Sequence, residues 1–312
     1  MDIVTGAFGY IGRYIAAQLI AAGRQVRTIT THVDKPNPFG AKVEAYPYNF
    51  DDPNTLIESL RGADTLYNTY WIRFEYGGQT FDQAVNNTEI LFECAVKAGI
   101  KQIVHISVTK ASVESHLPYY VGKGRQEEAL KNLGIDYRIV RPTLVFGVED
   151  ILVNNIAWLI KKFPMFPIMG DGRYQLQPVF VGDLASITLD SINNQRSTTI
   201  DAIGPESYSY LEFVKTIAKA LGKKPLLIKA PPKFGIFLGR AIGLFVRDVI
   251  LTEEELMGLM SSLLTSIQEP NGDTRFSKWI EENRLVIGRS YSSELDRHFR
   301  WSRVSAGDDK NV

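Results

Sequence analysis

Three glycines near the start of the chain have the spacing of a phosphate-binding turn. Gly6, Gly9 and Gly12 follow a short apolar run and lead directly into an amphipathic helical pattern. The N-terminus of such a helix presents unpaired backbone N–H groups and a partial positive charge, which together bind a pyrophosphate. In that arrangement the first glycine permits the turn, the second lets the phosphates approach and the third lets the helix pack on the strand. The spacing predicts a dinucleotide site, with a purely structural turn as the alternative.

Tyr119 and Lys123 form a second pair with a chemical use. They are four residues apart, so on a helix the phenol and the ammonium lie on one face. A nearby ammonium favours the phenolate and lowers the tyrosine pKa from about 10 toward neutrality. Such a phenol can exchange a proton with a carbonyl or hydroxyl group during hydride transfer. A chance pairing on one helix is the alternative, and the position of the pair after the fifth predicted strand favours the chemical one.

The elements that must position these residues alternate along the first half of the chain. Short apolar segments predict strands at residues 3–4, 26–31, 43–48, 65–68, 102–106 and 136–140. Amphipathic patterns predict helices at residues 12–22, 53–60, 81–98 and 119–133. Strands that alternate with helices form right-handed βαβ units and a parallel sheet covered on both faces. The predicted fold class is α/β, a Rossmann-type doubly wound parallel sheet with a smaller helix-rich C-terminal lobe.

The alternation ends near residue 147, where a second part of the chain begins. Further helices are expected at residues 152–163, from 183, at 208–221 and within 234–264, and the segment 177–180 is expected to return to the sheet as a strand. The dinucleotide-binding domain is therefore predicted over residues 1–150, completed by about 176–203. A substrate lobe follows over residues 151–175 and 204–303, with a flexible tail over 304–312.

Composition excludes several classes of protein. The 312 residues include 35 basic and 35 acidic ones, and this balance argues against a nucleic-acid binder. The single cysteine, Cys94, lies in a helical pattern and is expected to be a core thiol. The four histidines have no metal-ligand spacing, so no metal is predicted. Neither a signal peptide nor a transmembrane segment is apparent, and a cytoplasmic location is expected.

Both motifs resemble the signatures of the short-chain dehydrogenase/reductase superfamily, Thr5-Gly6-x-x-Gly9-x-x-Gly12 and Tyr119-x-x-x-Lys123. Segments 85–88, 141–147 and 178–183 resemble parts of its extended branch. Within the superfamily the chain is similar to atypical members, the group that contains the accessory NADPH-binding subunit of respiratory complex I. The motif and the resemblance together imply cofactor contacts from Gly6, Phe8, Gly9, Tyr10, Ile11, Gly12, Arg13, Thr31, His32, Asn49, Phe50, Asn68, Thr69, Tyr70 and Lys123.

The chain departs from that superfamily at two places near the expected chemistry. Extended enzymes carry a Ser or Thr just after the fifth strand, where its hydroxyl binds the substrate oxygen, and Val108 stands at that position here. Ser107 or Thr109 could substitute if the loop adjusts. The loop after the fourth strand places two aromatics, Tyr70 and Trp71, where many relatives have small residues; they could line the substrate pocket, stack near the nicotinamide or only pack. The resemblance supports cofactor binding more firmly than turnover.

The residues at the end of the second strand predict NADP(H) in preference to NAD(H). A carboxylate there would bind the ribose 2′-hydroxyl and repel a 2′-phosphate. The strand ends instead with Thr31 and His32, and Arg13 follows the third glycine. Hydroxyl, imidazole and guanidinium groups suit a phosphate better than a diol. The alternative is that Arg13 is a solvated helix residue.

Three functions are compatible with these residues. The first hypothesis is an NADP(H)-dependent reductase or dehydrogenase acting on an apolar carbonyl- or quinone-type small molecule, with Tyr119 as general acid/base and Lys123 lowering its pKa. The alternative is a redox sensor or assembly subunit that holds NADPH without reacting it, a hypothesis motivated by Val108. A nucleotide-sugar epimerase or dehydratase ranks third. The helices at 81–98 and 119–133 resemble those that pair in dimeric relatives, so a homodimer is left open.

Overall fold

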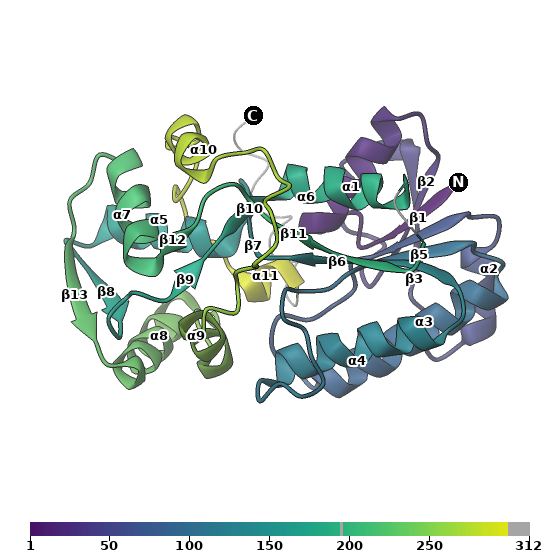
Figure 1. The fold of residues 1–312 in the computed structure, drawn as a ribbon, viewed down its shortest axis with the longest axis horizontal. Coiled ribbons are helices and arrows are strands. Elements are labelled where there is room, and N and C mark those ends of the chain that lie inside the picture. The colour runs from purple at the N-terminus through teal and green to yellow at the C-terminus, as the bar shows by residue number, and fades with distance from the viewer. Residues whose placement is uncertain (194–195, 299–312) are drawn as a thin grey trace. The chain divides into compact units, whose positions relative to one another are not determined.

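The structure is a computed structural model that describes residues 1–193 and 196–298 (Figure 1). The chain divides into two compact units. Unit 1 comprises Met1–Thr143 and Val181–Ala202, and unit 2 comprises Leu144–Phe180 and the described residues from Ile203 onward. The tail predicted over residues 304–312 lies outside the described part of the chain.

Unit 1 is built on one seven-stranded sheet, and all of its neighbouring strands run parallel. The strand order is β11-β6-β5-β4-β1-β2-β3, so the chain reverses direction across the sheet between β1 and β4. Rossmann-type sheets bind their ligands at the carboxyl ends of the strands beside such a reversal. The strands are β1 (Asp2–Thr5), β2 (Val26–Thr30), β3 (Val43–Pro47), β4 (Thr65–Asn68), β5 (Gln102–Ile106), β6 (Asp136–Pro142) and β11 (Thr198–Ala202).

Helices cover both faces of this sheet, which confirms the predicted doubly wound architecture (Figure 1). They are α1 (Tyr10–Ala21), α2 (Pro53–Leu60), α3 (Phe81–Lys97), α4 (Pro118–Asn132) and α6 (Val181–Asp190). On one face, Leu56, Leu91 and Leu130 of α2, α3 and α4 are fully buried in one apolar cluster with the sheet. On the other face α1 packs beside α6, where Gln18 Nε2 donates a hydrogen bond to the carbonyl oxygen of Gly182 at 3.0 Å.

Unit 2 combines short strands and helices around an aromatic core. Its elements are β7 (Leu144–Phe146), α5 (Ile151–Lys162), β8 (Met165–Met169), β9 (Gln175–Leu176), β10 (Pro178–Phe180), β12 (Tyr208–Ser209), α7 (Tyr210–Ala220), β13 (Leu226–Ala230), α8 (Pro232–Val246), α9 (Glu253–Met260), α10 (Phe276–Glu282) and α11 (Glu294–His298). Phe213 stacks on Phe276 with ring centroids 4.5 Å apart, and Phe146 lies 5.0 Å from both Phe276 and Trp279. These rings belong to one buried cluster that joins α5, α7 and α10.

One expectation for the second half of the chain was wrong. The segment 177–180 does not return to the large sheet, because β10 pairs with β7 and the edge beside β6 is taken by β11. The helices expected within 234–264 are confirmed as two, because Arg247 ends α8 in the left-handed region at φ 56° and Thr252 caps a new helix. The capping box between Thr252 and Glu255 places three glutamates at the positive end of α9.

Among the described residues, none of the helices combines the length and the apolarity that crossing a bilayer requires. The same part of the chain contains no group of three or more His, Cys, Asp or Glu side chains that could hold a metal ion. Cys94 is buried, as expected for a core thiol, and its Sγ atom lies 3.7 Å from the carbonyl oxygen of Pro53.

Candidate functional site

The glycine turn has the local geometry that the sequence predicted. Gly6 adopts φ +63°, a conformation that side chains other than glycine rarely take, and its carbonyl oxygen accepts a 2.8 Å hydrogen bond from Gly9 N. A Cβ atom on Gly12 would lie 2.3 Å from that carbonyl oxygen, so only glycine lets α1 pack so closely on the turn. Ala7 N donates to Thr28 Oγ1 at 3.0 Å and fixes the turn to β2.

The N-terminus of α1 is left without a side-chain cap. Gly9 occupies the N-cap position with extended backbone angles, and none of the described side chains accepts a hydrogen bond there. The first-turn backbone groups that an anionic ligand would contact at such a helix N-terminus belong to Tyr10 and Ile11. Both residues are half-buried, whereas the Phe8 side chain is buried at 2% exposure, so at Phe8 only the backbone can face a ligand.

A cluster of polar groups ties the end of β1 to the end of β4. Thr5 Oγ1 donates to Asn68 Oδ1 at 3.0 Å and accepts from the backbone N–H groups of Thr69 and Tyr70 at 2.7 and 3.1 Å. Thr69 Oγ1 in turn donates to the carbonyl oxygen of Thr5 at 2.6 Å. These bonds hold the loop after β4 beside the glycine turn at the reversal point of the sheet.

His105 extends this cluster into the core as a neutral side chain. Tyr70 N donates to Asn68 Oδ1 at 3.1 Å, which identifies the amide oxygen, so Asn68 Nδ2 is the donor to His105 Nδ1 at 3.0 Å. The imidazole proton therefore resides on Nε2. Burial, reinforced by the charge of Lys123, holds the pKa of His105 well below its usual value of 6.5. His105 is thus a fixed neutral acceptor rather than an acid or base.

Phe50 and Tyr70, two of the residues expected to contact the cofactor, form an aromatic group with Tyr48. The Tyr48 and Phe50 rings stack at 4.8 Å, and Tyr70 lies 4.9 and 5.3 Å from them. Asn49, between the first two, takes the left-handed conformation at φ 46°, which Asn tolerates. Asn87 Nδ2 donates to Tyr70 Oη at 2.9 Å, and burial raises the Tyr70 pKa. Their contact with a cofactor remains a prediction.

The Tyr119–Lys123 pair lies on the first two turns of α4. Tyr119 is half-buried, and Lys123 is buried at 3% exposure. Lys123 Nζ donates to the carbonyl oxygen of Ile106 at 2.9 Å, at the end of β5. Burial penalises the charged form and lowers the pKa of Lys123 to about 7, while the nearby Glu127 carboxylate acts in the opposite direction. The lysine can therefore exchange its proton near neutral pH.

Trp71 lies across this pair, a placement that the sequence did not predict. Its indole stacks on Phe81 at 5.5 Å, meets Tyr119 edge-on at 5.8 Å and lies 4.7 Å from Lys123 Nζ. A Cβ atom at Gly122 would come within 2.5 Å of the indole, so this glycine makes room for the ring. Trp71 Nε1 is buried and has no hydrogen-bond partner among the described residues. The only sequence signal was a bulky aromatic where many relatives have a small residue.

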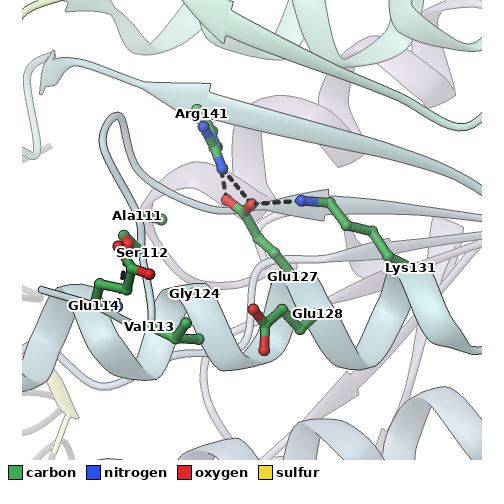
Figure 2. A pocket seen from close by; sticks show the side chains of 9 residues that line it. All are labelled: Ala111, Ser112, Val113, Glu114, Gly124, Glu127, Glu128, Lys131 and Arg141. Atoms are coloured by element: carbon green, nitrogen blue, oxygen red, sulfur yellow. Dashed lines mark hydrogen bonds and ion pairs between the residues drawn. The ribbon is translucent and has the colours of Figure 1, made fainter.

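Ser107 is engaged by a buried carboxylate. Its Oγ atom donates to Glu127 Oε1 at 2.6 Å, and Glu127 is itself 2% exposed. Arg141 Nε donates to the same oxygen at 2.8 Å, and Lys131 Nζ lies 3.4 Å from Oε2 (Figure 2). This network borders a cavity of about 270 Å³, lined by Ala111, Ser112, Val113, Glu114, Gly124, Glu127, Glu128, Lys131 and Arg141 (Figure 2).

The neighbours of Ser107 do not supply a hydroxyl at the expected position. Val108 stands there and is buried at 6% exposure. Thr109 is fully buried, and its backbone N–H donates to the carbonyl oxygen of Pro142 at 3.0 Å. Because side chains alternate along extended backbone, Ser107 and Thr109 lie on the face opposite Val108. Val108, the residue expected at the position of that hydroxyl, is thus apolar and buried in this structure.

The end of β2 carries no acidic side chain. β2 ends at Thr30, whose Oγ1 accepts a hydrogen bond from His32 N at 3.4 Å. Thr31 is exposed, and Arg13 is half-buried on the first turn of α1. The first acid after the strand, Asp34, is exposed in the following turn. The side chains at the end of β2 are therefore neutral to basic.

The first part of the chain is similar to a described family of proteins. Residues 6–147 match the family model described as NAD(P)H-binding. The chain is 27% identical over 242 residues to the mitochondrial NADH dehydrogenase (ubiquinone) 1 alpha subcomplex subunit 9 of Arabidopsis thaliana, covering 73% of this chain and 60% of that protein. It is 27% identical over 243 residues to the mitochondrial NADH-ubiquinone oxidoreductase 40 kDa subunit of Neurospora crassa, covering 74% and 62%. The matched regions thus span less than two thirds of these relatives.

Solved structures share the fold over most of the chain. The triphenylmethane reductase of Citrobacter sp., complexed with NADP(H), superposes with a TM-score of 0.74 at 17% identity, covering 91% of this chain and 99% of that one. A nucleoside-diphosphate-sugar epimerase of Staphylococcus aureus gives 0.70 at 18%, covering 94% and 99%. The NADPH-dependent quinone oxidoreductase of Escherichia coli, complexed with NADPH, also gives 0.70 at 18%, covering 90% and 99%.

Proposed function

We propose that this chain is an NAD(P)H-binding member of the short-chain dehydrogenase/reductase superfamily that holds NADP(H) without turning it over. The glycine turn supports the binding half of this proposal. Its helix N-terminus is uncapped among the described residues, and its close packing leaves no room for a Cβ atom at Gly12. The first-turn N–H groups would bind the pyrophosphate, and the loop at Asn68 and Thr69 would border it.

The preference for the phosphorylated cofactor rests on the end of β2. A 2′-phosphate carries up to two negative charges, and a carboxylate at this position would repel it. Thr31, His32 and Arg13 offer hydroxyl, imidazole and guanidinium donors instead. Charge-assisted hydrogen bonds from such groups are stronger than neutral ones, so they favour NADP(H) over NAD(H).

The main observation in favour of cofactor binding without hydride transfer is the position of Trp71 over Lys123 and against Tyr119. A bound nicotinamide supplies a hydride, and a substrate must then receive a proton from a side chain nearby. Here the indole covers the lysine, the lysine ammonium is hydrogen-bonded to Ile106, and Val108 replaces the hydroxyl that would orient a substrate oxygen. These three features support retention of the cofactor over transfer of its hydride.

A reductase is the second candidate, and the Tyr119–Lys123 pair favours it. Both side chains lie on one face of α4, and Lys123 can exchange a proton near neutral pH. If Trp71 turned aside, Tyr119 could act as general acid toward a carbonyl or quinone oxygen. The two mitochondrial relatives are named as subunits of an NADH dehydrogenase, which fits a cofactor-holding subunit as well as a redox enzyme. The epimerase hypothesis rests on fold alone.

The test is a measurement of what the purified full chain carries and whether it reacts. Mass spectrometry of the nucleotide released by denaturation should identify NADP(H) at close to one per chain. The loaded protein is then mixed with carbonyl, quinone and flavin acceptors. We expect the nicotinamide absorbance to persist. Steady oxidation by any acceptor, abolished in Tyr119→Phe with the nucleotide content unchanged, would overturn the holding role and establish the reductase.

A further inference from the structure

Helix α8 of unit 2 buries its small residues and exposes its large ones. Gly235, Gly239 and Gly243 are four residues apart, so they share one face, and all three are buried. A Cβ atom on Gly235 would come within 2.2 Å of Met169 Sδ, and one on Gly243 within 2.5 Å of the carbonyl oxygen of Asp248. The glycines thus let the helix lie directly on the body of unit 2.

The opposite side of this helix is apolar and exposed. Phe234 is 49% exposed, Phe237 68% and Leu244 84%. At 100° per residue these three positions fall within one narrow sector of the helix, which we name the α8 face. Just before the helix, Leu226 and Ile228 alternate on β13 and are also exposed. Figure 1 shows β13 and α8 at the same end of unit 2. Contiguous exposed apolar side chains of this kind mark an interaction surface.

The charge around this surface has one sign. The segment 222–247 contains six basic residues and no acidic one, although the whole chain has 35 of each. Three of the six, Lys233, Arg240 and Arg247, are seven residues apart and therefore line one edge of the α8 face. All three are exposed. The remaining three, Lys223, Lys224 and Lys229, precede the helix.

We propose that the α8 face binds the surface of a bilayer that contains anionic lipids, with the helix lying in the plane of the interface. Helices with aromatic and aliphatic residues on one side and Lys or Arg beside them bind membranes in this way. The 15 residues of α8 span about 22 Å, short of the roughly 30 Å hydrocarbon core, which fits an in-plane position. The inference is independent of the cofactor.

The positive charge beside the α8 face favours an anionic bilayer over a second copy of the chain as its binding partner. A two-fold contact through the α8 face would bring two sets of basic side chains together, and such like-charge contacts are destabilising. Anionic headgroups would neutralise the same side chains. The long stems of Lys and Arg can also extend from an apolar surface toward headgroups.

The test is flotation of the full chain with vesicles of phosphatidylcholine, alone or mixed with phosphatidylglycerol. We expect binding to the mixed vesicles and a decrease at high salt. Phe237→Ser with Leu244→Ser should lower the partition coefficient on the order of a hundredfold, because two exposed apolar side chains are lost from the interface. Lys233→Gln with Arg240→Gln should lower it about fivefold per charge on mixed vesicles only.

Ile267→Ser is the matched control, because Ile267 is a fully exposed apolar side chain of unit 2 outside the α8 face. It should float like the parent. Failure of the parent to float with either vesicle would overturn the proposal in favour of a protein partner. Self-association of the parent that is lost in the Phe237→Ser, Leu244→Ser variant, without flotation, would overturn it in favour of a second copy.

Discussion

The ammonium of Lys123 lies over the indole ring of Trp71, with Nζ 4.7 Å from the ring centroid. A cation over an aromatic face is attracted to it, and the ring also excludes water from the charge. Exclusion of water has the larger effect on proton affinity, because the pKa of Lys123 is lowered to about 7 by burial. Trp71 thus covers the Tyr119–Lys123 pair and forms part of the surroundings whose burial of Lys123 lowers its pKa to about 7.

Replacement of Lys123 should change how stability depends on pH. The lysine pKa is about 7 in the folded chain and 10.5 in the unfolded chain. Between these values the unfolded state binds one proton more, so this residue makes the free energy of unfolding rise by about 1.4 kcal/mol per pH unit. Below pH 7 the lysine is charged in both states, and the full free-energy cost of burying that charge lowers the stability of the folded chain. Urea unfolding of the parent and Lys123→Met across this window should show the slope only in the parent.

Trp71→Ala provides the control for that experiment. Water would reach the ammonium in this variant, so the folded pKa should move back toward 10.5 and the slope should shrink while the lysine is retained. A parent with the same pH dependence as Lys123→Met would show that the ammonium is solvated, and a parent whose stability falls with rising pH would show that it is better paired than the structure indicates.

Removal of the Glu127 charge should destabilise unit 1 strongly. Glu127→Gln keeps the shape of the side chain but leaves Arg141 without its buried counter-charge, and breaking such a pair costs about 3–5 kcal/mol. Glu128→Gln alters the next residue, which is exposed, and should change stability by less than about 0.5 kcal/mol. Equal unfolding midpoints for the two variants would mean that the network in Figure 2 contributes no stability.

Arg13 should determine the choice between the two dinucleotides. Arg13→Gln removes a guanidinium beside the predicted 2′-phosphate, and a charge-assisted hydrogen bond contributes about 1.5–3 kcal/mol. The affinity for NADPH should therefore fall roughly tenfold or more, with that for NADH nearly unchanged. Arg61→Gln, at an exposed surface pair with Glu58, should alter neither. A parallel loss for both dinucleotides would assign Arg13 to another role.

The sequence predicted the parallel sheet well because local and global signals agree there. The strand at Gln102–Ile106 and the helix at Pro53–Leu60 have the bounds that periodicity gave. Asp52 caps that helix by accepting a hydrogen bond from Thr55 N, and Pro53 follows at its first position. The glycine turn was predicted for the same reason, since each of its three glycines has a separate local requirement.

Long-range pairing could not be predicted from the chain. The segment containing Val179 has the composition of a strand that would fit either sheet, and its pairing with β7 depends on β11 having taken the edge beside β6. The placement of Trp71 depends on Gly122, 51 positions later, whose missing side chain admits the indole. The hydrogen bond from Ser107 to Glu127 likewise joins the residue after β5 to α4 through tertiary contact alone.

The central claim, that the uncapped N-terminus of α1 binds the cofactor diphosphate, is tested most directly at Gly9. Gly9 occupies the N-cap, so in Gly9→Asp the carboxylate would occupy the anion site, while the added Cβ atom meets the carbonyl oxygen of Gly6 at 3.1 Å in this variant and in Gly9→Ala alike. Titration with NADPH should then show affinity roughly a hundredfold lower than in Gly9→Ala, which adds the same Cβ without the charge. Equal NADPH affinity in the two variants would contradict the account.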